Sequence, residues 1–386
     1  MIYYVQQGEL PQKKHVTFHD PHDDKKLLWE ELVGGSGFYG FHSTKYHHYL
    51  PTAVENIINL EHDSVVWEKD LPLQNLHFDA LAQNKGDFLG SMSTFLGNED
   101  ILLHVSTPTK NQDYFYKNTH HHELFFIHEG CGTLCTEYGE LKFSEGDYLY
   151  IPKATIYQFN FLNSVNRLLW IETTQCLRIP DEFVNCHGQL LEHAPYSERD
   201  FRHPILKKAF REKGEFTLRI RSKGQITQYT LPHHPFDVEG WDGYLFPFAF
   251  QVDDYCPIVG KLHQPPSVHK MFENNHMMIT NFVPRLLDFH NNAIPVPYYH
   301  SNIDCEEILY YVKGNFMSRK GIEEGSITLH PSGVPHGPQP GVVENSLNKK
   351  EVNELAIMID TYKPVYLSRT ANEKRYTNYY KSWLST

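Results

Sequence analysis

Two histidines and a choice of carboxylates between Tyr298 and His336 have the types and spacing of a metal site. His300 lies in the stretch YYHSNIDCEEILYYVKG, and His336 lies near the end of the stretch GSITLHPSGVPHG. Two imidazoles and one carboxylate are the ligand set of non-heme Fe(II) oxygenases, which keeps coordination positions open for other molecules. The segment therefore predicts an open metal site built on neighbouring β-strands.

The acidic ligand is less obvious from the sequence, because Asp304, Glu306 and Glu307 all follow His300 closely. Alternate residues of a strand share a face, so one unbroken strand from His300 would favour Asp304 or Glu306. A turn at NIDCE would instead let Glu307 open the next strand, ILYYV. We select Glu307 because of its spacing to Gly314, and we keep Glu306 as the alternative.

Two spacings of the second half of the chain recur in the first half, at offsets of 184 and 179 residues. Glu123 and Gly130 are seven residues apart, as are Glu307 and Gly314. Gly146 and Pro152 are six residues apart, as are Gly325 and Pro331. A repeat of this kind indicates a duplicated β-domain.

The N-terminal copy lacks one residue of a three-ligand site. His120, His121 and His122 precede Glu123, but Tyr157 stands where the histidine of the second spacing belongs. We therefore expect a degenerate copy with a structural role. The three histidines could instead reach an interface or the active site of a neighbouring subunit.

The composition favours a β-protein around these residues. Aromatic residues make up 14% of the chain, with 24 Gly and 23 Pro, and short runs such as FTLRIRS, LFFIHEG, DYLYIP and ELAIMID are separated by turn residues. Aromatic and β-branched runs between turn residues are typical of strands. Long helical periodicity is scarce, so we predict an all-β fold with few short helices.

Charge and cysteine content exclude several classes of protein. The net charge of −12 argues against binding to nucleic acid or to an anionic membrane. Six dispersed cysteines without a CxxC pair do not form a disulfide scaffold. Neither a signal peptide nor a membrane-spanning run is evident, so we expect a cytoplasmic protein.

The chain is long enough for two domains of ordinary size. We predict an N-terminal degenerate domain over 1–190, a connecting region over 191–250 and a C-terminal catalytic domain over 251–386. The stretch from about residue 189 to residue 211 is polar and irregular, which suits a connection between two domains.

The spacings resemble the two motifs of the cupin superfamily. Gly325, Pro331, Gly333 and His336 match the second motif, and His300, Glu307 and Gly314 match the first. Asn302 stands where the second histidine of the first motif is usual. The resemblance implies a bicupin, with two double-stranded β-helix (jelly-roll) domains.

A closer resemblance covers most of the chain. The stretches VPYYHSN, HQPPSVH, LHPSGVPHGP and GELPQKKHVTF are similar to those of the homogentisate 1,2-dioxygenase family, particularly its shorter bacterial members. That family uses Fe(2+) and O2 to open the ring of homogentisate to maleylacetoacetate in tyrosine and phenylalanine breakdown. The resemblance implies a small aromatic acid and O2 as partners, and a homo-oligomer.

The resemblance also assigns roles to individual residues. His300, Glu307 and His336 match the iron ligands, and His263 matches the histidine that acts as acid or base on the substrate hydroxyl. The positions implied for substrate binding are Asn302, His330, His336 and Phe316. Family members have one residue fewer between the first histidine and the glutamate, and they carry tyrosine where this chain has Phe316, so a hydrogen bond to substrate would be lost.

An anionic substrate in an acidic protein needs local positive charge, for which Arg285 and Arg319 are candidates. Two other functions stay open: a cupin dioxygenase for another hydroxylated aromatic acid, such as gentisate, and a non-catalytic bicupin binding protein.

Overall fold

The structure is a computed structural model that describes residues 3–34, 41–60, 65–68, 73–316 and 321–384. Its regular elements are almost all β-strands, so the predicted all-β class is confirmed. The α-helices of the described residues are α1 (Phe78–Leu81), α2 (Val342–Ser346) and α3 (Arg369–Lys374). No helix in these ranges is long and apolar enough to cross a membrane.

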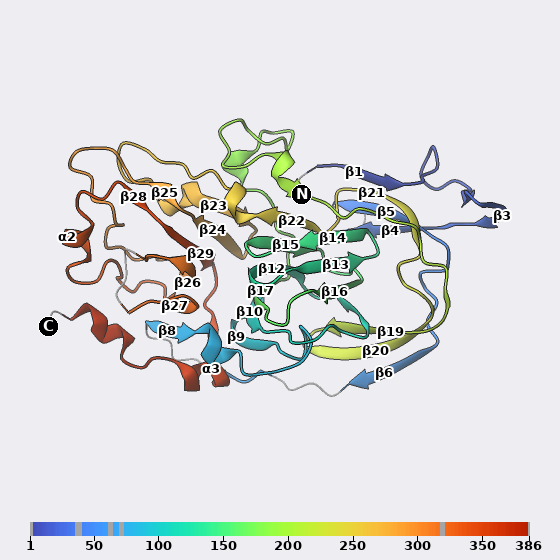
Figure 1. Ribbon diagram of the computed structural model, residues 1–386, viewed down its shortest axis with the longest axis horizontal. Helices are drawn as coiled ribbons and strands as arrows, with labels where there is room; N and C mark the ends of the chain where they lie inside the picture. The colour runs from blue at the N-terminus through green and yellow to red at the C-terminus, as the bar shows by residue number, and fades with distance from the viewer. Residues whose placement is uncertain (1–2, 35–40, 61–64, 69–72, 317–320, 385–386) are drawn as a thin grey trace.

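Two large sheets form the N-terminal domain, drawn mainly in green at the centre of Figure 1. In spatial order, the nine-stranded sheet contains β18 (Phe201–Arg202), β22 (Phe248–Gln251), β15 (Asp147–Ile151), β12 (His122–Glu129), β17 (Arg167–Thr173), β10 (Ile101–Ser106), β9 (Ser93–Gly97), β30 (Tyr366–Ser368) and β7 (Trp67–Glu68). The seven-stranded sheet contains β14 (Gly139–Phe143), β13 (Gly132–Thr136), β16 (Tyr157–Phe161), β11 (Phe115–Asn118), β19 (Lys213–Ser222), β20 (Gln225–His233) and β6 (Asn56–Leu60).

Strand β12 shows how the sequence fills two cores at once. Phe125 and Ile127 belong to an aromatic cluster that includes residues of both large sheets, whereas Leu124 and Phe126 belong to the large cluster shared with the C-terminal domain. Because successive residues of a strand point to opposite faces, a nearly continuous apolar run predicts such burial on both faces.

The C-terminal domain, drawn in orange and red, is built on one six-stranded sheet (Figure 1). Its strands, in spatial order, are β23 (Lys270–Glu273), β24 (Met277–Phe282), β29 (Glu354–Thr361), β26 (Glu306–Gly314), β27 (Ser326–His330) and β8 (Gln74–His77). The short pair β25 (Arg285–Leu286) and β28 (Glu351–Val352) accompanies this sheet, and an isolated bridge joins His300 to His336.

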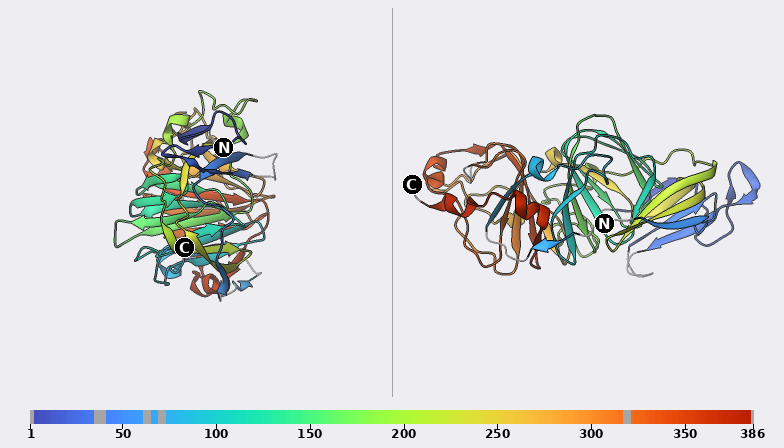
Figure 2. Two further views of the ribbon diagram at one scale, coloured as in Figure 1. Left: turned by 90° about the vertical axis from the view of Figure 1, so that its right-hand side faces the viewer. Right: turned by 90° about the horizontal axis from the view of Figure 1, so that it is seen from below.

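The two domains lie side by side along the long axis of the molecule and exchange strands (Figure 2). Strand β8, from the N-terminal part of the chain, pairs with β27 of the C-terminal sheet. Strand β30, from the C-terminal part, pairs with β9 of the N-terminal sheet. Each sheet therefore needs a strand from the other half of the sequence.

A smaller sheet and a hairpin extend the N-terminal domain at the right of Figure 1. The sheet contains β1 (Val5–Gly8), β21 (Val238–Gly243), β5 (His42–His47) and β4 (Trp29–Gly34), and the hairpin is β2 (His19–Asp20) with β3 (Asp23–Leu27). Strands β18 to β22, most of the expected connecting region 191–250, pair with strands of the N-terminal domain. We therefore propose that the domain boundary lies near residue 252.

Candidate metal centre

The backbone places the two predicted histidine ligands directly opposite each other. His300 and His336 form an antiparallel bridge, in which each backbone N–H donates to the carbonyl of the other at 2.9 Å. Their rings lie on the same side, with centroids 4.4 Å apart. An isolated backbone bridge is therefore enough to bring the two imidazoles together, although neither residue lies in a long strand.

The face of β26 distinguishes the two candidate glutamates. Glu307, Leu309 and Tyr311 all line a pocket of the C-terminal domain. Glu306 points to the opposite face, where its carboxylate accepts a hydrogen bond from the backbone N–H of Val365 at 2.8 Å. Strand β26 begins only at Glu306, after the loop 301–305, so strand parity counted from His300 does not apply. The structure thus brings Glu307, and not Glu306, to the histidines.

The three side chains form a compact donor set. Glu307 Oε2 lies 3.6 Å from His300 Nε2 and 3.5 Å from His336 Nε2, and the donor atoms all lie within 4.8 Å of one another. The Nδ1 atoms of His300 and His336 each lie 3.0 Å from a backbone carbonyl, of Tyr298 and Val334 respectively. A carbonyl only accepts hydrogen bonds, so Nδ1 carries the proton and Nε2 keeps a lone pair.

His336 provides a further indication that this donor set suits a metal. Its Nε2 is buried and has no hydrogen-bond partner among the described residues. A buried polar atom without a partner is costly in free energy, whereas a lone pair aimed at a cation is satisfied. Two neutral imidazoles and a carboxylate fit a divalent transition metal with open coordination positions.

The carboxylate of Glu307 is held ionised by its neighbours. Burial acts to raise its pKa, but the neighbouring imidazoles of His300, His330 and His336 hold that pKa well below the ordinary value. The shortest contact, 2.7 Å, joins Glu307 Oε1 to His330 Nδ1. His330 is fully buried and stacks on His336, with ring centroids 4.4 Å apart. His330 therefore orients the carboxylate from behind and does not line the pocket wall.

Replacing His330 with leucine is expected to weaken metal binding about 10- to 100-fold, because the outer hydrogen bond that fixes Glu307 is lost. His330→Gln, which can still donate to the carboxylate, should lose less. Titration of the apo protein with Co(II) would measure both affinities. Equal affinity of His330→Leu and wild type would show that this hydrogen bond does not position the ligand.

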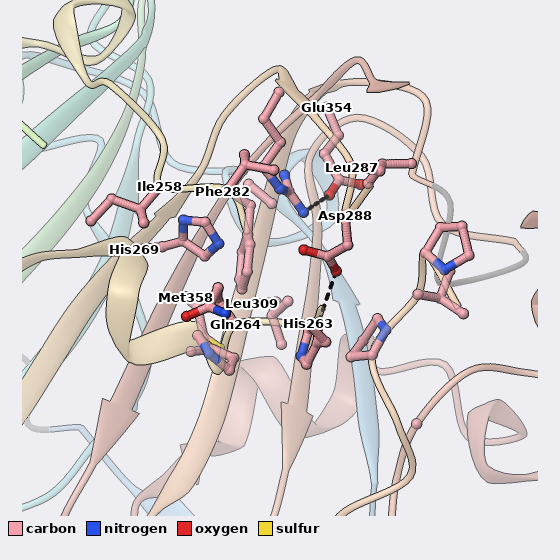
Figure 3. A pocket seen from close by; sticks show the side chains of 18 of the residues that line it. Ile258, His263, Gln264, His269, Phe282, Leu287, Asp288, Leu309, Glu354 and Met358 are labelled. Atoms are coloured by element: carbon pink, nitrogen blue, oxygen red, sulfur yellow. Dashed lines mark hydrogen bonds and ion pairs between the residues drawn. The ribbon is translucent and has the colours of Figure 1, made fainter. Parts of the chain in front are cut away.

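Two residues of the donor set, His300 and Glu307, line a pocket with mixed polar and apolar walls (Figure 3). Its apolar part includes Ile258, Phe282, Leu309 and Met358. Its polar part consists of titratable side chains, which include His263, His269, Arg285, Asp288, Glu354, His300 and Glu307. An apolar pocket with a few convergent polar groups is typical of small-molecule sites.

His263 stands in this pocket with one ring nitrogen facing a carboxylate. Its Nδ1 lies 4.0 Å from Asp288 Oδ2, and its Nε2 is buried with no hydrogen-bond partner among the described residues (Figure 3). Burial lowers the pKa of His263, and the opposing effect of Asp288 does not reverse this. The imidazole is therefore neutral at neutral pH, with Nε2 able to accept a proton.

The other predicted site residues lie in different environments. Arg285 lines the pocket, but its guanidinium already pairs with Glu354 at 3.3 Å. Phe316 packs against the ring of Tyr311, which lines the pocket, at a centroid distance of 4.9 Å, and Phe316 is not itself among the lining residues. Asn302 is also absent from the lining, and its backbone carbonyl accepts from Gly333 at 2.7 Å. Arg319 lies outside the described residues.

Sequence reasoning missed three residues near the site. His269 and Asp288 line the pocket, and the indole N–H of Trp383 donates to the carbonyl of Gly337, next to His336, at 3.0 Å. The motif HQPPSVH contains a second histidine that could have drawn attention to His269. Nothing in the local sequence distinguishes Asp288 or Trp383.

The N-terminal domain has a buried charged cluster at the position of its degenerate motif. The hydroxyl of Tyr157 donates to Glu123 at 3.0 Å, and the guanidinium of Arg221 bonds to Glu172. Burial and the charge of Glu172 raise the pKa of Glu123 well above its ordinary value. A tyrosine and a guanidinium here contact the carboxylates that a metal would need, so we propose that this copy is structural.

Removing Arg221 should therefore destabilise the protein without changing its metal content. Arg221→Leu leaves the carboxylate of Glu172, which is fully buried, without its cation, at a cost of about 3–5 kcal/mol. Lys207→Leu is the matched control, since Lys207 forms an exposed pair with Glu140 that is worth at most about 1 kcal/mol. Thermal melting and metal analysis would test this, and equal melting temperatures of the two variants would contradict it.

A second group of possible metal ligands, Glu31, His47 and Glu137, already holds a cation. The ammonium of Lys45 lies 2.7 Å from Glu31 and 2.8 Å from Glu137, and its side chain is buried. The carboxylates keep the pKa of Lys45 above its ordinary value despite burial. This cluster is a buried ion-pair network, and Lys45 occupies the place of an ion.

Two family models match most of this chain. The sequence models of the homogentisate 1,2-dioxygenase N-terminal and C-terminal families match residues 46–252 and 253–386. A protein of Saccharolobus solfataricus, to which dioxygenase activity is provisionally assigned, is 38% identical over the full length of both chains. The homogentisate 1,2-dioxygenase of Bradyrhizobium diazoefficiens is 24% identical, covering 77% of this chain and 70% of the relative.

Among solved structures, a cupin 2 conserved barrel domain protein from Leptotrichia buccalis covers 76% of this chain and 98% of its own, with 8% identity and a TM-score of 0.37. The two family models together extend from residue 46 to the last residue. The chain belongs to the homogentisate 1,2-dioxygenase family.

Proposed function

We propose that the protein is an Fe(II)-dependent dioxygenase that opens the ring of homogentisate, or of a closely related hydroxylated aromatic acid, to a maleylacetoacetate-type product. The observation that carries the proposal is the donor set of His300, Glu307 and His336, of which His300 and Glu307 line a pocket that also contains His263. Two imidazoles and one carboxylate with open positions suit Fe(II). When bound, iron would supply Lewis acidity and electrons for the reaction with O2.

His263 has the environment of a general base for a phenolic hydroxyl. With Nδ1 toward Asp288, the free lone pair is on Nε2, which is buried and has no hydrogen-bond partner among the described residues. Its lowered pKa keeps the ring neutral and ready to accept the hydroxyl proton. The neighbouring carboxylate of Asp288 would stabilise the imidazolium that results.

The apolar wall has the chemistry to hold an aromatic ring and to exclude water. Phe282, Leu309 and Met358 present ring and aliphatic surface next to the donor set. Removing water from the site strengthens hydrogen bonds and charge interactions with the substrate. The ring would thus be positioned between the donor set and the base, which lowers the entropic part of the barrier.

Oxygen uptake after anaerobic loading of the wild-type chain with Fe(II) tests the proposal. Homogentisate should give rapid uptake and a ring-opened product. Uptake with gentisate but not with homogentisate would select the alternative substrate. No iron binding and no uptake with either acid would support a non-catalytic binding protein and would refute the enzyme.

We also propose that the protein forms a homo-oligomer. Six large apolar side chains between residues 286 and 303 are more than half exposed, namely Leu286, Phe289, Ile294, Tyr298, Tyr299 and Ile303. A segment rich in exposed apolar side chains is typical of a contact surface. Light scattering coupled to size-exclusion chromatography would measure the mass, and a monomer at micromolar concentration would contradict the proposal.

A further inference from the structure

His269 is a buried titratable residue of the pocket to which the proposed reaction assigns no role. It is 6% exposed, it lines the pocket, and its Nδ1 has no hydrogen-bond partner among the described residues (Figure 3). Leaving such an atom without a partner costs free energy. An atom of this kind beside a cavity is suited to a hydrogen bond with a ligand.

The backbone holds His269 rigidly. The residue ends the 3-10 turn Pro266–His269, which follows Pro265 and begins with a second proline. Its ring packs near Phe282, with centroids 5.7 Å apart. Because the proline pair and this packing restrict the segment, a hydrogen bond from His269 would cost little conformational entropy.

The position of His269 is distinct from that of the donor set. The ring of His263 packs edge-on against Tyr298 at a centroid distance of 5.1 Å, and Tyr298 packs in turn against the metal ligand His300 at 6.0 Å. His269 packs instead near Phe282 of the apolar wall, apart from His263 (Figure 3). A ligand atom that meets His269 belongs to the end of the molecule away from the metal.

The charge state of His269 restricts what it can recognise. Burial, with smaller contributions from Arg285 and His263, lowers its pKa to about 3, so the ring is neutral. The charge of Arg285, which also lines the pocket, is compensated by Glu354, and its guanidinium also donates to the carbonyl of Val283 at 3.0 Å. This end of the pocket thus offers a neutral hydrogen-bonding group and little net charge, which suits a hydroxyl better than a second carboxylate.

We propose that His269 is a substrate-binding, specificity-determining residue that hydrogen-bonds a neutral hydroxyl on the ring edge remote from the metal. The inference rests on the proposed function, because it assumes an aromatic acid bound at the donor set. It adds a second recognition point to the contact made by His263. The site therefore selects aromatic acids with a second hydroxyl over those with one.

Binding to the anaerobic, Fe(II)-loaded full chain tests this with two acids, homogentisate and 2-hydroxyphenylacetate, which lacks the remote hydroxyl. His269→Leu should weaken homogentisate binding about 5- to 100-fold and leave 2-hydroxyphenylacetate within about 2-fold. His269→Gln, which keeps a hydrogen-bonding side chain, should recover most of the loss. In turnover, His269→Leu should raise KM more than it lowers kcat. Loss of the general base in a His263 variant should instead lower kcat.

The exposed residue His193 provides a matched control, since His193→Leu makes the same substitution away from the pocket. Equal weakening of both acids, or no weakening of either, would refute the role of His269 while the proposed function stands. Binding of neither acid by the wild-type protein would refute the substrate class, and this inference with it. Iron content measured in every variant separates these outcomes from damage to the metal site.

Discussion

Replacing His336 with alanine is expected to abolish iron binding and oxygen uptake while the fold survives. His336 supplies one of three donor atoms that lie within 4.8 Å of one another. Two remaining protein ligands hold a divalent metal poorly, so Fe(II) affinity should fall by more than about 100-fold, beyond the range for an outer hydrogen-bonding partner. Iron analysis after anaerobic reconstitution and desalting would measure the loss.

The fold should survive because the bridge between His336 and His300 uses backbone atoms only and does not depend on the imidazole. The hydrogen bond that the side chain makes through Nδ1 goes to the nearby backbone carbonyl of Val334, within the same turn. Circular dichroism and the melting temperature of the apo protein check this point. His290→Ala, on the loop before His300 and outside the pocket lining, is the matched control. Full iron occupancy in His336→Ala would show that the ligand set is wrong.

The sequence predicted the all-β class and the convergence of the donor set for a physical reason. Motif spacing encodes where strands begin and turn, and Glu307 follows this rule through its distance to Gly314. The alternative, parity counted from His300, required a strand that the loop 301–305 interrupts. Spacing to a turn glycine was therefore a better guide than alternation, because Gly314 has a φ of 103°, which few other residues adopt.

Long-range partners could not be predicted in the same way. The exchange of β8 and β30 between the domains joins segments that are far apart in the sequence, and no local pattern specifies such pairing. The position of His330 behind Glu307 likewise depends on the register of β26 with β27, in which these two residues lie opposite each other. Register is set by the packing of whole strands, so the substrate-binding role that the family resemblance implied for His330 could not be tested from the sequence, and its side chain is not among the pocket-lining residues.

Replacing His263 with glutamine is expected to lower kcat about 100- to 10,000-fold while iron stays bound, because glutamine fills the space but cannot accept the hydroxyl proton. His263 is not one of the donor residues, and its nearest charged partner is Asp288. Steady-state oxygen uptake gives kcat, and iron analysis shows that the centre is loaded. Asp288→Asn should show a smaller loss, since it weakens only the stabilisation of the imidazolium.

The pH profile separates a base at His263 from a residue that only binds. Burial places the pKa of His263 below 6.5, and only the neutral ring accepts a proton. Wild-type kcat should therefore be level through neutral pH and fall as the pH drops through a value below 6.5. The residual kcat of His263→Gln should not decrease in this acidic range, because the group that titrates there has been removed. If the variant kept the wild-type profile with only a raised KM, His263 would be a binding residue and the proton would go to another group.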